Sequence, residues 1–103
     1  MKILREVTDD GADAAGRSEL LHHEENVRVA RFHLDAGAVV EPHRSDSTVL
    51  LHVIRGAGTF RSGDHEALLT EGESALFAPG QVHAVEAGGV PVTFLAVLAP
   101  GPR

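Results

Sequence analysis

The stretch that decides the fold runs from Gly37 to Gly56 and reads Gly-Ala-Val-Val-Glu-Pro-His-Arg-Ser-Asp-Ser-Thr-Val-Leu-Leu-His-Val-Ile-Arg-Gly. A glycine suited to a turn stands at each end, because glycine adopts positive φ without steric cost. Between them lie a single histidine, His43, and an apolar run. Strand residues that are an even number of positions apart point to the same side of a sheet. We therefore expect His43, Ser45 and Val49 to share one face.

A second stretch, from Gly72 to His83, reads Gly-Glu-Ser-Ala-Leu-Phe-Ala-Pro-Gly-Gln-Val-His. It ends in a Pro-Gly pair, which is a strong turn signal. We expect the chain to turn at Pro79 and Gly80, just before His83.

Length and composition indicate one acidic globular domain over residues 1–103. The net charge of −6 argues against a nucleic acid partner, since an acidic surface repels phosphate. Without cysteine, tyrosine or tryptophan, the chain has no disulfide, thiolate ligand or phenol. The first residues include charged side chains and no apolar segment of the kind found in a signal peptide. No apolar run approaches the roughly 20 residues of a membrane helix. We expect a cytoplasmic protein with no membrane partner.

Short runs of Val, Leu, Ile and Phe, separated by Gly, Pro and Asp, predict an all-β fold. Only 12–19 has a pattern that could form a short helical turn. The Ser62-Gly63-Asp64 segment predicts a hairpin, Gly88-Gly89 a turn, 1–8 an N-terminal strand region and 100–103 a tail. About ten short strands suit a sandwich or a jelly roll. We place them at 2–7, 18–23, 27–34, 38–42, 48–55, 58–62, 65–70, 74–78, 82–86 and 92–98.

The two stretches together resemble the paired signatures of the cupin barrels, and this resemblance favours the jelly roll. The first signature is Gly, five residues, His-x-His, three or four residues, Glu, six residues and Gly. Gly37, His43 and Gly56 match it, while Ser45 and Val49 replace the second His and the Glu. The second signature is Gly, five residues, Pro-x-Gly, two residues, His, three residues and Asn. Its matches are Gly72, Gly80 and His83, with the proline displaced to Pro79 and Ala87 in place of Asn.

In metal-binding cupins, the resemblance implies, three imidazoles and one carboxylate converge on a divalent transition metal such as Fe, Mn, Ni or Zn. Only His43 and His83 remain here from that set. Two imidazoles without a carboxylate would hold a metal weakly, because affinity rises with the number of deprotonated ligands.

Strand parity extends the expected cavity beyond these two histidines. We expect its wall to include Arg31, His33, Ser45, Val49, Leu51, Val53 and Phe77. His52 has the opposite parity to Leu51 and is expected to point away from the cavity. Such a wall suits a small molecule and offers one cation.

Two functions follow from these expectations. The first is a small cupin barrel that binds a small molecule, with no assigned reaction. The second is a metal-dependent enzyme of the dioxygenase, isomerase or lyase kind, in which a substitute ligand joins His43 and His83. An outward apolar stripe at Leu50 and Ile54 also predicts a homodimer, since such surface is rarely left exposed on a monomer.

Overall fold

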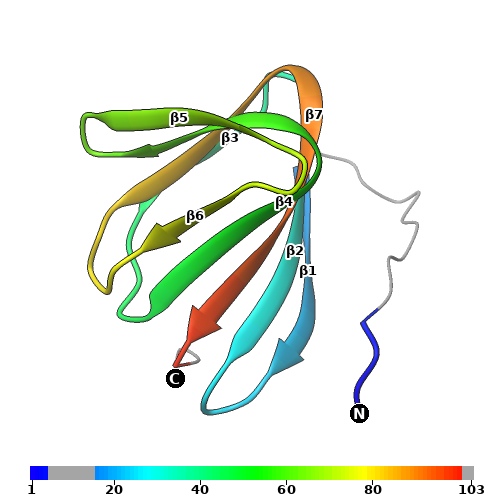
Figure 1. Ribbon diagram of the computed structural model, residues 1–103, viewed down its shortest axis with the longest axis vertical. Coiled ribbons are helices and arrows are strands. Elements are labelled where there is room, and N and C mark those ends of the chain that lie inside the picture. The colour runs from blue at the N-terminus through cyan, green and yellow to red at the C-terminus, as the bar shows by residue number, and fades with distance from the viewer. Residues whose placement is uncertain (5–15, 101–103) are drawn as a thin grey trace.

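The computed structural model describes residues 1–4 and 16–100, which form seven strands and no helix (Figure 1). The predicted all-β class is therefore confirmed. The strands are β1 (Gly16–His23), β2 (Arg28–Leu34), β3 (Val39–His43), β4 (Thr48–Ser62), β5 (His65–Thr70), β6 (Ser74–Phe77) and β7 (His83–Ala99). Most of the predicted strands lie within a few residues of these bounds.

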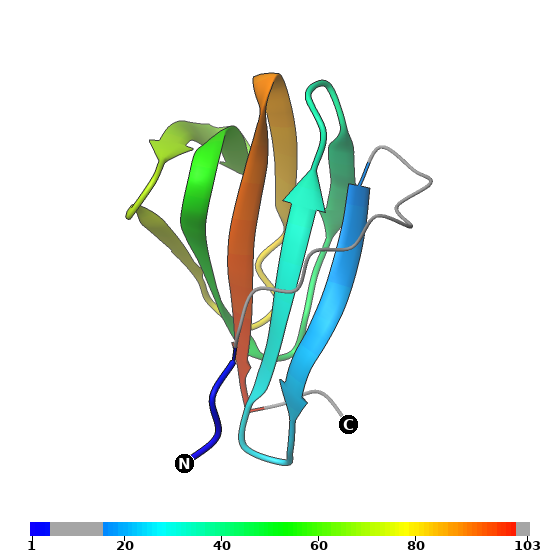
Figure 2. The same ribbon diagram turned by 90° about the vertical axis from the view of Figure 1, so that its right-hand side faces the viewer.

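Two long antiparallel strands, β4 and β7, hold the fold together. Their pairing extends from Thr48 opposite Ala99 to Arg61 opposite Ala84. The first half of β4 and the last half of β7 join β6, β2 and β1 in one layer. Their other halves join β5 and β3 in a second layer. Figures 1 and 2 show the two layers as a folded sheet that opens at the end where β7 terminates.

The bend between the layers corrects two predicted turns. Gly56, which the sequence suggests for a turn, does not reverse the chain, and the Gly88-Gly89 pair is not a turn, because all three lie inside β4 or β7. The ladder passes from Gly56 opposite Val92 to Gly58 opposite Ala87, so β7 carries extra residues at the corner. Such a bulge bends a strand and increases its twist without reversing it. The chain therefore turns from one layer to the other while both strands continue.

Two predictions near the N-terminus also need correction. Residues 2–4 of the expected first strand lie outside any strand, and 5–7 are outside the described residues. Lys2 contacts His22 at 2.8 Å and Leu4 lines a hollow over the outer face of the first layer, so this segment lies against the face of the sheet. Of the predicted helical turn, 16–19 belong to β1, and 12–15 are not described.

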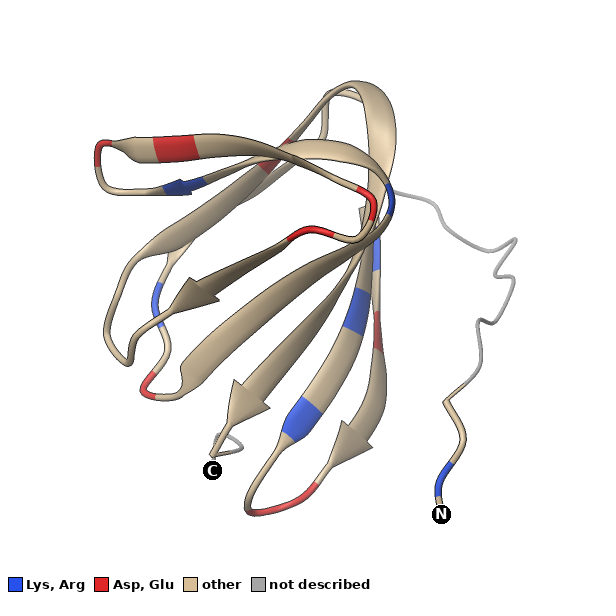
Figure 3. Cartoon of the chain, viewed as in Figure 1, with Lys and Arg blue, Asp and Glu red and all other residues tan. Residues whose placement is uncertain are grey.

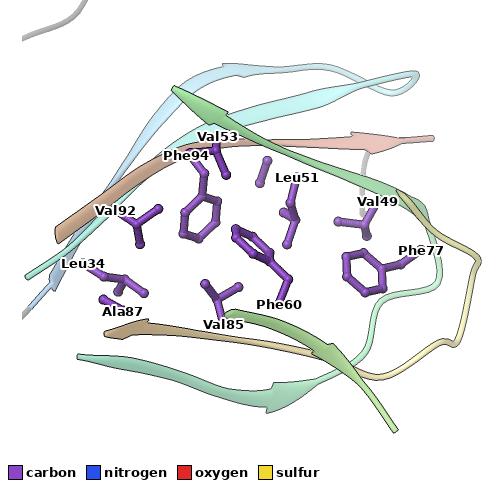
Figure 4. Close-up of a cluster of buried hydrophobic side chains, with 11 residues drawn as sticks. Leu34, Val49, Leu51, Val53, Phe60, Phe77, Val85, Ala87, Val92 and Phe94 are labelled. Carbon is purple, nitrogen blue, oxygen red and sulfur yellow. The ribbon is translucent and has the colours of Figure 1, made fainter. Parts of the chain in front are cut away.

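The core lies between the two layers (Figure 4). Phe94 lies near its centre, stacked on Phe32 at 5.3 Å between ring centroids and edge-on to Phe60 at 5.5 Å. Alternate residues of β4, β7 and β2 supply most of the wall, as the period of two along a strand requires. The buried members are Leu34, Val49, Leu51, Val53, Phe60, Phe77, Val85, Ala87, Val92, Phe94 and Ala96.

No helix able to cross a membrane occurs in the parts of the chain that the structure describes.

Candidate functional site

A cavity of about 290 Å³ lies between the two layers, beside the core. Its volume is at the lower end of the roughly 300–1,000 Å³ typical of small-molecule sites. Nine of its lining residues are apolar: Ala30, Phe32, Val40, Val49, Leu51, Val85, Phe94, Ala96 and Leu98. The polar lining residues are Arg28, His43, Arg44, Ser45 and His83.

The ends of two paired strands bring His43 and His83 together. The two residues are directly opposite each other in the β3–β7 ladder. Their ring centroids are 4.1 Å apart, with the rings at 66°. The structure thus has the two histidines as neighbours in one cavity, as the cupin resemblance implies.

Backbone carbonyls fix the tautomer of both rings. The Nδ1 of His43 lies 3.0 Å from the carbonyl oxygen of Glu41, and the Nδ1 of His83 lies 3.3 Å from that of Gln81. A carbonyl can only accept, so each Nδ1 must carry the proton and donate it. In the neutral rings, each Nε2 then keeps a free lone pair.

Burial keeps His83 neutral. Its side chain is almost fully buried. The pKa of His83 is lowered from its ordinary value first by this desolvation and then by repulsion from His43, against an opposing hydrogen bond to Gln81. His83 thus offers an imidazole acceptor instead of a fixed positive charge.

Ser45 and Val49 also line the cavity, in the positions that the cupin resemblance assigns to two metal ligands. Ser45 is held by its own loop and by the turn between β6 and β7, since its Oγ accepts from the Ser47 amide at 3.1 Å and its carbonyl accepts from the Gly80 amide at 2.7 Å. Val49 is only 2% exposed, and its side chain has no atom that can bind a metal.

These residues do not fit the metal set that the resemblance implies. Within residues 1–4 and 16–100, no three His, Cys, Asp or Glu side chains come together in a way that could hold a metal ion. His43 and His83 alone leave the ligand set without its third imidazole and its carboxylate. No chemical step through a metal can be derived from this site.

Four of the residues expected in the cavity lie elsewhere. Val53 and Phe77 are buried in the core cluster and do not line the cavity. Arg31 and His33 are on the opposite face of β2, where Arg31 lies 3.7 Å from Glu19. The Nδ1 of His33 lies 2.8 Å from the Thr93 hydroxyl oxygen, and its Nε2 lies 3.1 Å from the Asp35 carboxylate.

The alternate residues of β2 supply three of the lining residues that the sequence analysis did not predict: Arg28, Ala30 and Phe32. The others are Val40, Arg44, Val85, Phe94, Ala96 and Leu98. The sequence does indicate which residues of β2 face the core. Ala30, Phe32 and Leu34 are apolar at every second position, whereas the intervening positions include Arg31 and His33. The apolar phase of a half-buried strand faces the core, and Arg28 extends that phase to the start of β2.

A family described as the AraC-like ligand binding domain matches residues 26–103. The chain belongs to this family. Among curated proteins, none matches. The match begins just before β2 and includes every residue that lines the cavity.

Solved structures support the fold. A protein from Klebsiella pneumoniae with a double-stranded β-helix domain has 25% identity and a TM-score of 0.79, covering 87% of this chain and 81% of that one. An RmlC-like cupin from Methanocaldococcus jannaschii has 24% identity and a TM-score of 0.79, covering 98% and 95%. The DMSP lyase DddQ from Ruegeria pomeroyi has 16% identity and a TM-score of 0.78, covering 91% of this chain and 54% of that one. The cupin-type jelly roll expected from the resemblance is thus confirmed, and the chain is a cupin-barrel ligand-binding domain.

Proposed function

We propose that this domain binds a small, largely apolar molecule in the cavity between its two layers, with no assigned reaction. The single observation that carries the proposal is the cavity itself, with nine apolar lining residues and a few polar groups at one side. Such a combination is usual for small-molecule sites, where apolar walls supply affinity and sparse polar groups fix orientation.

The histidine pair supports binding through its acceptor atoms. Because each Nδ1 donates to a backbone carbonyl, a bound hydroxyl or amide group can donate to Nε2 of His43 or His83. A metal-dependent enzyme would need a further ligand beside this pair. The described residues supply none, so binding is the function that the site favours.

A neutral aromatic probe, benzyl alcohol, tests the proposal. We expect titration to shift the amide resonances of cavity residues such as Ala30 and Leu51 in ¹⁵N–¹H spectra, with saturation. Ala96→Leu should weaken binding, because Ala96 lines the cavity and is 4% exposed. Ala67→Leu is the matched control, since Ala67 is exposed on β5. Equal binding by both variants, or no shift at cavity amides, would contradict the proposal.

We also propose that the protein is a homodimer formed through the outer face of the first layer. Leu50, His52 and Ile54 of β4 lie on this face and are each half-buried. His52 and Ile54 also line a hollow on this face, together with Leu4, Leu21 and Leu95 and with the polar side chains of Arg31, Arg55 and Thr93. Apolar area of this kind is a common site of protein association.

A further inference from the structure

We infer that the ligand of the cavity is a small carboxylic acid, bound as its carboxylate by Arg28. This inference rests on the proposed binding function and names the chemical class of the ligand. Arg28 is the first residue of β2, lines the cavity, and pairs in the sheet with Leu98, another lining residue.

The first argument is an unpartnered donor. The Nε atom of Arg28 is buried and has no hydrogen-bond partner among the described residues. Such groups are uncommon in folded proteins, because a buried donor without an acceptor loses its hydration and gains nothing in return. Nε and one Nη lie on the same edge of the planar guanidinium, the edge that binds a carboxylate through two parallel hydrogen bonds. A carboxylate in the cavity would give this atom its acceptor.

The second argument is the charge of the lining. The protein has 15 acidic residues against 9 Lys and Arg, yet no Asp or Glu is among the lining residues that the structure describes. Figure 3 shows the acidic positions mostly at turns and on outer strands. The only side chains of fixed charge in the lining are Arg28 and the exposed Arg44. Neither has an ion-pair partner among the described residues, so both charges are available to an anion.

The third argument separates a carboxylate from phosphate. A phosphate group carries more charge and three acceptor oxygens, and it needs several donors around it. The lining residues next to Arg28 on the sheet, Ala30 and Leu98, have side chains that cannot donate, and the other donors, Arg44 and Ser45, belong to the loop after β3. A carboxylate satisfies one guanidinium edge while its hydrocarbon part contacts the apolar lining side chains. The site therefore suits a carboxylic acid with a short aliphatic or aromatic body.

Calorimetric titrations with two matched pairs test this inference: benzoate against benzamide, and hexanoate against hexanamide. Each amide has the shape of its acid but no charge. Wild-type protein should bind the acids about 10- to 100-fold more tightly than the amides, the effect of a charge-assisted hydrogen bond. Arg28→Met should remove this preference. Arg28→Lys keeps the charge and should restore it only in part, because an ammonium has no planar edge.

Arg17→Met is the matched control, since Arg17 is exposed on β1 and does not line the cavity. It should bind as wild type does, and circular dichroism should show that all three variants fold. The inference is overturned if wild type shows no preference for the acids, if Arg28→Met keeps it, or if inorganic phosphate binds more tightly than benzoate. Amide binding that Ala96→Leu blocks, without an acid preference, would leave the proposed function standing and remove only the carboxylate. Absence of binding by every probe would overturn both.

Discussion

Substituting Gly56 with alanine should destabilise the fold more than the same change at Gly37 or Gly80. All three glycines have positive φ, at 79°, 82° and 80°. They differ in their surroundings. A Cβ on Gly37 or Gly80 would meet nothing within 4 Å, whereas a Cβ on Gly56 would lie 1.9 Å from the carbonyl oxygen of Pro91.

The magnitudes follow from this difference. In open space, alanine at positive φ costs about 1–2 kcal/mol, the strain of the left-handed conformation. At Gly56 the contact must also lengthen from 1.9 Å to at least 3.0 Å, a shift of about 1.1 Å in backbone. Pro91 is followed by Val92, which pairs with Gly56 and is completely buried. The shift would therefore disturb the core, and we expect a total cost above about 4 kcal/mol, the range of exceptional substitutions.

Urea unfolding and thermal melting of the three single variants measure these costs. For a domain of this size each kcal/mol lowers Tm by about 4–8 °C. The Tm of Gly37→Ala and of Gly80→Ala should therefore fall by about 4–8 °C for each kcal/mol of strain. Gly56→Ala should lose at least twice as much, or fail to fold. The reasoning is refuted if Gly56→Ala melts within 2–3 °C of the other two.

Three further predictions concern pH, metal and assembly. Burial and His43 hold the pKa of His83 below its ordinary value of about 6.5, so the unfolded chain binds a proton at this residue before the folded protein does as the pH falls. The free energy of unfolding should therefore decrease below that pH. Urea titrations at pH 7.5 and 5.5 should show a smaller decrease for His83→Gln than for the wild type. Wild-type protein should carry substoichiometric metal. The double variant Ser45→His, Val49→Glu should bind zinc more tightly by orders of magnitude, as measured by calorimetry, and its metal-free form should melt at a lower temperature than the wild type. If the double variant gains no zinc affinity, these two positions do not correspond to the metal ligands of the cupins. Sedimentation should show a dimer at micromolar concentration, whereas a species of 10.9 kDa would contradict the proposed interface.

The sequence predicts the fold because turn chemistry and apolar spacing are local. The hairpin at Gly63 depends on features readable within a few residues. The ladder that places His43 opposite His83 joins distant segments, and only the resemblance to the cupin signatures predicts it. The bend at Gly56 is different. The glycine pattern is equally compatible with a chain reversal and with a bend inside a strand. The carbonyl of Pro91, on another strand, lies close to Gly56, and this long-range contact is not visible in the sequence.

The cavity was predictable in part, for a related reason. The parity of Ser45, Val49 and Leu51 relative to His43 is correct, and these residues line the cavity. Parity alone does not show where the cavity wall ends, so it predicts Val53 in the wall although Val53 belongs to the adjoining core. In β2 the polar residues Arg31 and His33 resemble site groups, and the prediction based on them selects the wrong face of the strand. The apolar residues Ala30, Phe32 and Leu34, at every second position, indicate the correct face.

Ser45 and Val49, which stand where metal ligands are expected, and Arg28, with its unpartnered Nε, line the same cavity. In the metal set that the resemblance supplies, a carboxylate balances part of the charge of the ion, but here that position is Val49. A divalent cation would meet two imidazoles and the positive charges of Arg28 and Arg44, without a carboxylate among the described lining residues. An anion would meet the same guanidinium groups favourably, because each offers donors that no described residue accepts. The changes that weaken the site for a cation are thus the ones that leave it suited to an anion.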